Sequence, residues 1–286
     1  MKILKMFKDK TVFSFEVFPP KRTTPIESIY KTLDELKDLK PDFISVTYGA
    51  GGSNIGASTT QIASTIKRNY GIEPVAHLPC INFTKDEILR ILDDFHRNDI
   101  ENILALRGDI NPDISPKKDF KYASDLVEFI KQNRDFHIIG ACYPECHFES
   151  IDLDTDIKNL KKKVDAGADQ LITQLFFDNN IFYSFLENVR KAKIKVPIQA
   201  GIMPVVNKKQ IERMVSLCGA SLPTKFTKIM QRYENHPEAL RDAGIAYAVN
   251  QIVDLIANGV DGIHLYTMNN AYVAKRISDA ISGVLI

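Results

Sequence analysis

Short apolar runs alternate along this chain with longer segments in which apolar residues recur every three or four positions. The short runs are rich in β-branched and aromatic residues, and several lack the polar–apolar alternation of a half-exposed strand. This pattern is typical of parallel strands that are covered on both faces. We expect eight such strands, at Val12–Val17, Phe43–Thr47, Pro74–Leu78, Asn102–Leu106, His137–Tyr143, Gln170–Gln174, Pro197–Ile202 and Gly262–Tyr266.

The segments between these strands have the apolar spacing of amphipathic helices, with one buried and one solvated face. The longest apolar stripe runs through residues 245–256. Residues typical of helix ends occur at the expected places. Thr84 and Glu87 have the spacing of an N-terminal capping box, and Gly167 and Gly259 stand where a helix C-terminus is expected.

Eight strand–helix units with right-handed crossovers predict an α/β fold that closes into a (β/α)8 barrel, a TIM barrel. The interval between the seventh and eighth strands is about twice the others, so we expect an extra helix near Thr224–Tyr233, before the last strand. An open doubly wound sheet is the main alternative. Because no linker rich in proline, glycine or serine interrupts the chain, we expect residues 1–286 to form a single domain.

Composition narrows the class of protein further. Of the 286 residues, 44% are hydrophobic and 26% are charged, which is ordinary for a globular protein and excludes a disordered or disulfide-dense chain. Lys and Arg number 37 against 36 Asp and Glu, so the chain lacks the positive charge of a nucleic-acid-binding protein. No apolar stretch is long enough for a membrane helix, and the first residues lack the apolar core of a signal peptide. We therefore expect a cytoplasmic protein with free cysteines and with no nucleic-acid or membrane partner.

Polar side chains end six consecutive predicted strands, at intervals of about 30 residues. They are Glu16, Thr47, His77, Arg107, Tyr143 and Gln174. The carboxyl ends of barrel strands form the rim on which active sites are built, so we expect these side chains to gather there. A ring of polar side chains at that rim is difficult to explain by fold stability alone.

Glu16 lies in the largely apolar segment from Phe15 to Pro20. Apolar neighbours remove water from a carboxylate, raise its pKa and suit it to general-acid catalysis near neutral pH. The alternative is an ordinary exposed glutamate in a loop.

Two motifs follow other predicted strands. Arg107, Gly108 and Asp109 offer a forked cation for phosphate, a close backbone approach and a carboxylate beside a cofactor ring; the alternative is a plain salt bridge between Arg107 and Asp109. Residues 48–53 are rich in glycine but match neither the dinucleotide-binding fingerprint nor a Walker loop. We interpret them as a rim loop whose backbone can approach a ligand closely.

Cys142, Cys146 and His147 lie together after the fifth predicted strand and suggest a zinc site. The chain lacks a second Cys/His pair at ligand spacing, so we expect no metal, and His147 is free to contact a cofactor's phosphate or sugar.

The helix expected to start near Asp154 carries Asp156, Asn159 and Lys163 on one face. Such a face is usually solvated. The functional alternative is a polar strip beneath a long anionic ligand that crosses the rim.

Taken together, these residues resemble methylenetetrahydrofolate reductase of the bacterial, catalytic-domain-only kind, over essentially the whole chain. Eight blocks carry the resemblance in order, at residues 14–20, 45–50, 105–109, 122–127, 143–145, 163–168, 172–178 and 264–269. The resemblance implies a (β/α)8 barrel that binds FAD without a Rossmann domain and uses NADH or NADPH as co-substrate. The implied reaction reduces 5,10-methylenetetrahydrofolate to 5-methyltetrahydrofolate for methionine synthesis, in two ping-pong half-reactions at one flavin face.

The resemblance also implies roles for individual residues. Glu16 would be the general acid that protonates the folate nitrogen, and Asp109 a catalytic carboxylate beside the flavin and the pterin. Folate would be contacted by Glu16, Asp109, Gln174, Gln210 and Tyr266. The cofactor contacts would be Thr47 for the nicotinamide nucleotide and, for FAD, Tyr48, Ala50, His77, Arg107, Gly108, Asp109, Ala123, Tyr143, His147, Ser150, Asp156, Asn159, Lys162 and Lys163.

Two positions depart from the family pattern, and both concern folate. Asn270 stands where the family commonly has an arginine that contacts folate, and Met214 replaces an aromatic residue that packs on it. Two rival interpretations of the function follow: the same flavin reductase supplied with electrons by a partner subunit, or a non-catalytic barrel that binds flavin or folate. We also expect the chain to form a homo-oligomer.

Overall fold

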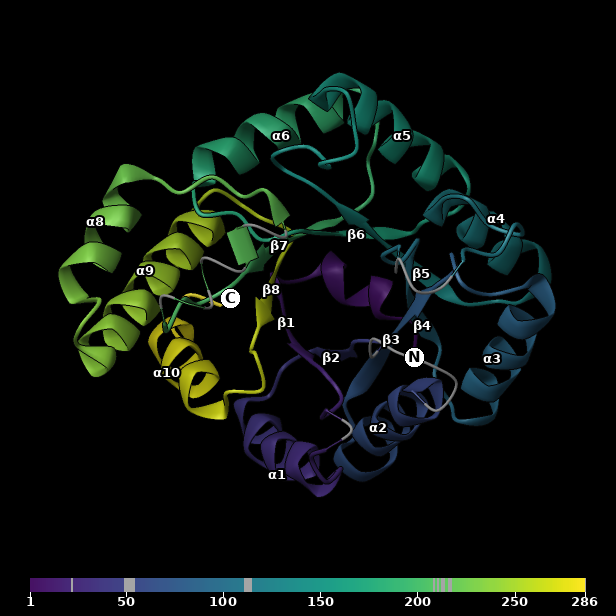
Figure 1. Cartoon of the computed structure of the whole chain (residues 1–286), viewed down its shortest axis with the longest axis horizontal. Helices are drawn as coiled ribbons and strands as arrows, with labels where there is room; N and C mark the ends of the chain where they lie inside the picture. Colours follow the sequence, from purple (N-terminus) through teal and green to yellow (C-terminus); the bar gives the residue numbers. More distant parts are fainter. Residues whose placement is uncertain are drawn as a thin grey trace.

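Eight parallel strands form a closed barrel in the computed structural model of this chain, with helices arranged around it (Figure 1). The structure describes residues 1–21, 23–48, 55–110, 115–207, 209, 211, 214–215 and 218–285, and of residues 55–57 only the backbone. The strands are β1 (Val12–Val17), β2 (Phe43–Val46), β3 (Glu73–Pro79), β4 (Asn102–Leu106), β5 (His137–Cys142), β6 (Gln170–Thr173), β7 (Ile198–Ile202) and β8 (Gly262–Tyr266). Each strand pairs in parallel with its neighbours, and β1 pairs with β8, Val12 opposite Gly262. The predicted TIM barrel is confirmed, and closure by β1 and β8 excludes the open sheet.

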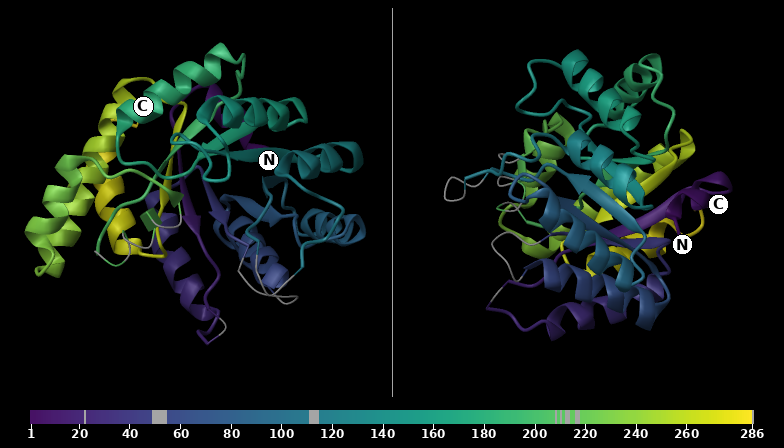
Figure 2. Two further views of the ribbon diagram at one scale, coloured as in Figure 1. Left: turned by 45° about the horizontal axis from the view of Figure 1, so that its top comes forward. Right: turned by 90° about the vertical axis from the view of Figure 1, so that its right-hand side faces the viewer.

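The helices occupy the intervals in which the sequence predicts them. They are α1 (Glu27–Leu36), α2 (Ile55–Tyr70), α3 (Lys85–Arg97), α4 (Ala123–Asn133), α5 (Leu153–Asp165), α6 (Asn179–Lys191), α8 (Thr224–Tyr233), α9 (Pro237–Ala257) and α10 (Ala271–Ile281), with short 3-10 helices η1 (Ile3–Lys8) and η2 (Lys37–Leu39). The extra helix before the last strand is α8, which packs outside the ring against α9 (Figure 2). In the described part of the chain, no helix has the length and apolar character needed to cross a membrane.

Local hydrogen bonds explain where several helices begin and end. The Thr84 hydroxyl accepts a bond from the Glu87 backbone N–H (3.2 Å), and the Glu87 carboxylate accepts one from the Thr84 N–H (2.7 Å). This is the predicted capping box at the start of α3. Gly167 and Gly259 follow α5 and α9 with φ of 120° and 72°, a backbone conformation that favours glycine.

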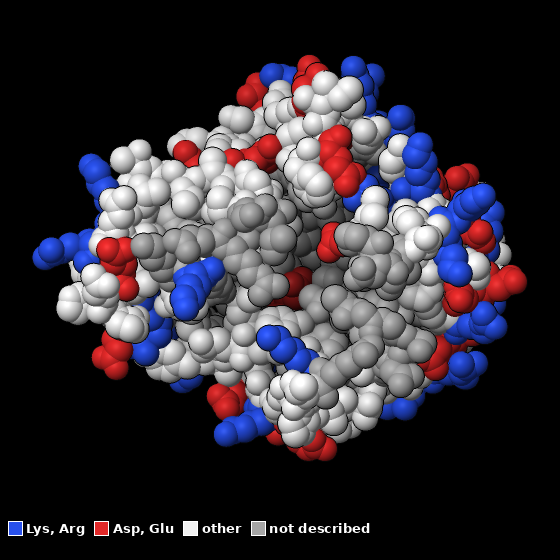
Figure 3. Space-filling view, in the orientation of Figure 1, with Lys and Arg blue, Asp and Glu red and all other residues white. Residues whose placement is uncertain are grey.

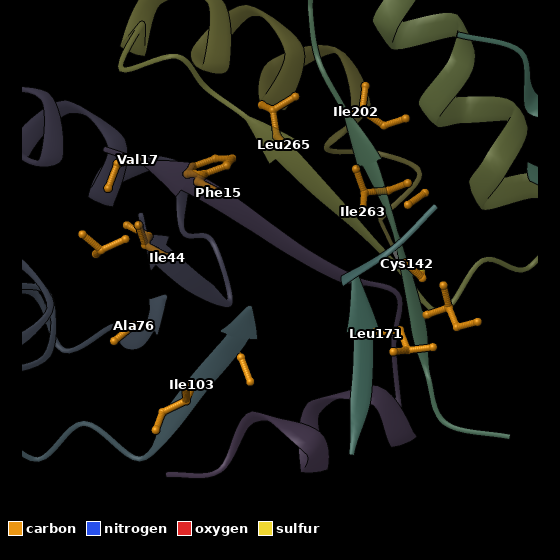
Figure 4. Packing of buried hydrophobic residues seen from close by; sticks show 14 of the residues in the cluster. Phe15, Val17, Ile44, Ala76, Ile103, Cys142, Leu171, Ile202, Ile263 and Leu265 are labelled. Carbon is orange, nitrogen blue, oxygen red and sulfur yellow. The ribbon is translucent and has the colours of Figure 1, made fainter. Parts of the chain in front are cut away.

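Strand side chains alternate between two environments. Those that point outward are mostly apolar and form one core cluster with side chains of the surrounding helices; Phe15, Ile44, Ile103 and Leu265 are among the strand residues of this cluster (Figure 4). Burial of this apolar surface is the main force that holds the helices to the barrel. Every second strand residue faces the barrel axis instead.

The N-terminal end of the barrel is closed by η1. Its Ile3 is fully buried against inward-facing apolar side chains from β1, β2, β3, β4, β5 and β6, and its backbone N–H donates to the Asn102 side chain (3.0 Å). With this end filled, the C-terminal end is the one at which the inward-facing side chains can line a cavity.

Candidate active site

A cavity of about 1120 Å³ opens at the C-terminal rim of the barrel. Its volume exceeds that of most sites for one small ligand, so it has room for a cofactor and a second molecule. Figure 3 shows the rim as a central depression with acidic side chains inside it. The predicted site residues that line the cavity are Glu16, Thr47, Tyr48, His77, Arg107, Gly108, Asp109, Tyr143, His147, Gln174 and Tyr266.

The other predicted site residues either lie outside the lining of this cavity or fall outside the described part of the chain. Ala123, Ser150, Asp156, Asn159, Lys162 and Lys163 lie outside its lining. Ala50 and Gln210 fall outside the described residues, as does most of the glycine-rich segment 48–53.

The polar face of α5 lies behind the cavity wall and is joined to it by hydrogen bonds. Lys163 Nζ donates to the carbonyl oxygen of Ala141, a cavity-lining residue, at 2.6 Å. The Asp156 carboxylate accepts a bond from the backbone N–H of His147 (3.1 Å). Burial lowers the pKa of Lys163, although the nearby Asp156 carboxylate opposes that shift. Part of this face is therefore built into the rim, while Asn159 is exposed.

Glu16 lies at the end of β1, with 19% of its side chain exposed. Its Oε2 atom is 3.5 Å from Nε2 of His77 on β3 and 3.6 Å from Nε2 of His264 on β8. Burial acts to raise the pKa of Glu16, but the hydrogen-bonding contact with His264 and the electrostatic attraction of the His77 and His264 imidazoles lower it more, so the pKa lies below its ordinary value of 4.5. The expectation of a raised pKa is wrong for the protein without ligands, because the sequence does not reveal two imidazoles brought in by distant strands.

His77 is buried beside Glu16, and burial lowers its pKa to about 4 despite the attraction of the carboxylate. Its imidazole is therefore neutral near pH 7. Its Nε2 atom has no hydrogen-bond partner, and the same is true of the side-chain oxygen of Asn82, which also lines the cavity. Buried polar atoms without partners are costly, so these two atoms point to a ligand that hydrogen-bonds to them.

Arg107 pairs with Glu149 rather than with Asp109. Both terminal nitrogens of the guanidinium donate to the Glu149 carboxylate, one of them at 2.9 Å, and these bonds raise the pKa of Arg107. The salt bridge with Asp109 is therefore not formed, and Asp109 is exposed at the rim. Between them, Gly108 has φ of 88°, and a Cβ there would lie 2.9 Å from the Pro79 side chain. This backbone conformation and close approach require glycine.

Tyr266 reaches across the barrel from β8. Its hydroxyl donates to the Thr173 carbonyl oxygen (2.7 Å), and burial raises its pKa well above the ordinary range. Its ring passes over Gly201 of β7, where a Cβ would lie 2.8 Å from the ring and 2.3 Å from the Thr173 oxygen. Gln174 lies in the same wall, and its side-chain oxygen accepts a bond from the Leu175 backbone N–H (2.9 Å).

His264 is the main functional candidate that the sequence reasoning missed. It lies in the middle of a predicted strand, where a polar residue suggests only a satisfied core position. The sequence did contain a signal, because side chains alternate between the two faces of a strand. His264 stands two residues before Tyr266, so both side chains point toward the barrel axis.

The cysteines lie apart from the cavity. Cys142 points outward into the core between strands and helices (Figure 4) and is buried, which raises its pKa. Cys146 contacts the carbonyl oxygen of His147 within its own loop. Among the described residues, no three His, Cys, Asp or Glu side chains are grouped so that they could hold a metal ion.

The two positions that depart from the family pattern have different places in the structure. Asn270 caps the start of α10, where its side chain accepts a bond from the Val273 N–H (3.1 Å). Met214 lines the cavity.

Comparisons with known proteins give a consistent result. A family model described as methylenetetrahydrofolate reductase matches residues 2–282. The 5,10-methylenetetrahydrofolate reductase of Escherichia coli is 38% identical over 264 residues, which cover 92% of this chain and 88% of that protein. Methylenetetrahydrofolate reductase (NADH) 1 of Arabidopsis thaliana is 37% identical over 91% of this chain, which spans 46% of that longer protein.

A solved structure supports the fold. It is an uncharacterized protein from Clostridium thermocellum, described as binding two copies of 5-methyl-5,6,7,8-tetrahydrofolic acid. It covers 99% of this chain with a TM-score of 0.66, and 97% of its own chain is matched. Because the sequences are only 17% identical, this similarity concerns the fold alone.

Proposed function

This chain belongs to the methylenetetrahydrofolate reductase family, and we propose that it reduces 5,10-methylenetetrahydrofolate to 5-methyltetrahydrofolate, with FAD as cofactor and NADH or NADPH as electron donor. The observation that carries the proposal is the position of Glu16. It is a largely buried carboxylate between two imidazoles, in a cavity with room for a cofactor and a substrate. A proton donor so placed fits a reaction in which a ring nitrogen must be protonated before the ring opens.

The residues present fit a flavin cofactor. When bound, FAD would accept hydride from the nicotinamide and deliver it to the folate. The side-chain oxygen of Asn82 offers a hydrogen-bond acceptor to a polar ring edge, Nε2 of His77 offers a donor or an acceptor according to its tautomer, and Gly108 leaves room for a ligand against the backbone. We propose that Thr47 contacts the nicotinamide nucleotide and that FAD is held by Tyr48, Ala50, His77, Arg107, Gly108, Asp109, Ala123, Tyr143, His147, Ser150, Asp156, Asn159, Lys162 and Lys163.

Phosphate binding would need a change at the rim. The Arg107 guanidinium is engaged by Glu149, whose side chain is 41% exposed, so this ion pair contributes little and can be exchanged for a phosphate. Arg107 and Lys163 then offer positive charge to the diphosphate, and His147 offers a hydrogen bond from its imidazole, whose pKa is lowered by burial. Lys163 lies behind the cavity wall, where its Nζ donates to the carbonyl oxygen of Ala141, so its charge would reach the diphosphate from behind that residue.

Glu16 would supply the proton. In the free protein its pKa is lowered, so the carboxyl group is ionised at neutral pH. Ligands that cover the carboxylate exclude water and act in the same direction as burial, which favours the protonated form. Glu16 could then donate its proton to the folate nitrogen as the five-membered ring opens to an iminium ion.

The other wall residues would bind and orient the folate. The exposed Asp109 carboxylate places a negative charge at the rim, where it stabilises a cationic iminium. We propose Gln174, Gln210 and Tyr266 as folate contacts, with Tyr266 held in place by its bond to Thr173.

Absorption spectroscopy of the purified protein tests this function. We expect a flavin spectrum that is bleached by NADH or NADPH without oxygen and restored by 5,10-methylenetetrahydrofolate. If neither nicotinamide bleaches the flavin but the folate reoxidises dithionite-reduced protein, the electrons come from a partner subunit. A flavin that the folate does not reoxidise would contradict the proposed reaction.

A further inference from the structure

The interior of this barrel holds a connected set of buried polar side chains below Glu16. His264 on β8, Ser14 on β1, Gln199 on β7, Gln170 on β6 and His137 on β5 all face the barrel axis, and each is at most 2% exposed. Aliphatic residues usually fill this position in such barrels. Polar groups buried so deeply persist only if they are hydrogen-bonded, so their bonds should be highly ordered.

The direction of these bonds follows from the amide of Gln199. Its Nε2 atom lies within 3.5 Å of two backbone carbonyl oxygens, those of Val12 and Ile263, which can only accept. The amide nitrogen therefore faces them, and it also donates to the Ser14 hydroxyl oxygen at 3.0 Å. The Gln199 oxygen accepts a bond from Gln170 Nε2 (2.7 Å).

The same reasoning extends the chain to the N-terminal end of the barrel. Since Gln170 donates through its nitrogen, its oxygen faces Nε2 of His137 at 3.1 Å and must accept. Nδ1 of His137 lies 3.5 Å from the carboxylate of Asp169, which also pairs with Lys131. All the bonds from His137 to Ser14 therefore point the same way, toward Glu16.

The Ser14 hydroxyl fixes the tautomer of His264. It has one proton and two acceptors within reach, Nδ1 of His264 at 2.7 Å and the Ile263 carbonyl oxygen at 3.4 Å. The longer contact is outside the usual range for an O–H donor, so the proton belongs on the bond to Nδ1. Nδ1 is then an acceptor, and Nε2 carries the hydrogen of the His264 ring.

The position of this hydrogen matters because Nε2 lies 3.6 Å from the Glu16 carboxylate. An N–H that faces a carboxylate favours its ionised form, whereas a bare ring nitrogen favours a protonated carboxyl group. Among the described residues, the titratable groups that act on Glu16 are His77 from β3 and His264 and Tyr266 from β8. Of these, His264 is the one that Ser14 holds.

We propose that Ser14 is a positioning residue that fixes His264 in the Nε2–H tautomer and so sets the pH range in which Glu16 can donate a proton. The buried amides of Gln199 and Gln170 keep the Ser14 hydroxyl oriented toward His264. The effect on catalysis rests on the proposed function of Glu16, but the tautomer does not.

Nuclear magnetic resonance of the flavin-loaded protein, labelled with ¹⁵N at its six histidines, tests the tautomer directly. A His264→Asn variant assigns the signal. We expect the hydrogen of His264 on Nε2 in the wild type, and a shift toward Nδ1–H in Ser14→Ala. Hydrogen on Nδ1 in the wild type would overturn the proposal, whether or not the variant folds and whether or not the protein reduces folate.

The pH dependence of the folate half-reaction tests the consequence. Ser14→Ala should move the alkaline limb of that profile upward by about one pH unit, the effect of losing roughly one hydrogen bond to a charged group. Reduction of the flavin by NADH should keep its pH profile.

Ser45→Ala is the matched control. Ser45 is equally buried and contacts the same ring at 3.4 Å, but on Nε2 rather than Nδ1. Its loss should leave both the tautomer and the pH profile unchanged. An unshifted profile in Ser14→Ala, or an equal shift in both variants, would overturn the role of Ser14.

Discussion

Replacing Glu16 with glutamine should separate the two half-reactions of the proposed mechanism. Glutamine has nearly the same shape but cannot donate the proton that ring opening needs. Reduction of the flavin by NADH involves no such proton donor, so Glu16→Gln should change its rate by no more than about threefold. The folate half-reaction should lose most of its rate.

The surroundings of Glu16 determine how large that loss is. His77 has a pKa of about 4 and is a neutral, poor proton donor near pH 7, and burial raises the pKa of Tyr143 to about 12. Burial also raises the pKa of Tyr266 well above its ordinary range, and His264 does not line the cavity. Since none of these groups can replace the carboxyl group, we expect the full contribution of a general acid to be lost, about 10²–10⁴-fold.

Anaerobic stopped-flow absorbance measures both half-reactions on the same protein. Glu73→Gln serves as the control, because Glu73 is also a largely buried carboxylate (11% exposed) but lies at the opposite end of the barrel, paired with Lys67. It should affect the two half-reactions equally and slightly. Equal losses in both half-reactions of Glu16→Gln would remove the acid role from this residue.

Three further substitutions test other parts of the structure. The wild-type protein should lose unfolding free energy between pH 6.5 and 4, because the His77 imidazole has a pKa of about 4 when folded and 6.5 when unfolded, so acid favours the unfolded chain. His77→Gln should make this loss smaller by up to about 3 kcal/mol in urea denaturation, and a loss equal to that of the wild type would contradict the prediction. Gly244→Ala should lower the unfolding free energy, because a Cβ would lie 1.7 Å from the Val205 carbonyl oxygen. Overpacking of this kind costs roughly 1–3 kcal/mol or more, which outweighs the ~1 kcal/mol helix preference for alanine, and a stabilised variant would refute the contact. Lys163→Ala should weaken the binding of FAD about tenfold in fluorescence titrations and the binding of FMN by less, since FMN lacks the second phosphate. Equal weakening of both would leave α5 without a role in binding the adenylate half of FAD.

Much of the fold could be predicted from the sequence because local patterns determine it. The expected strand Phe43–Thr47 differs from β2 by one residue, and the expected extra helix coincides with α8. Such features depend on hydrophobic period, glycine and capping residues, all of which lie within a few positions of one another. The place of Glu16 and His77 at one rim follows from the same periodicity.

The electrostatics of the site could not be predicted in that way. The lowered pKa of Glu16 depends on His264, which is brought beside it only when β8 closes the barrel on β1. The partner of Arg107 is likewise Glu149, from the loop after the next strand, rather than the nearby Asp109. Pairings between distant residues depend on the register of the barrel strands and on the direction of each side chain, and neither can be derived from the local pattern of a single sequence.

We propose above all that one cavity serves both the nicotinamide nucleotide and the folate in turn. Initial rates measured over a grid of NADH and 5,10-methylenetetrahydrofolate concentrations test it most directly. If the first product leaves before the second substrate enters, we expect parallel lines in double-reciprocal plots, with each substrate inhibiting competitively against the other at high concentration. Lines that intersect, as they do when both substrates occupy the protein together, would contradict it.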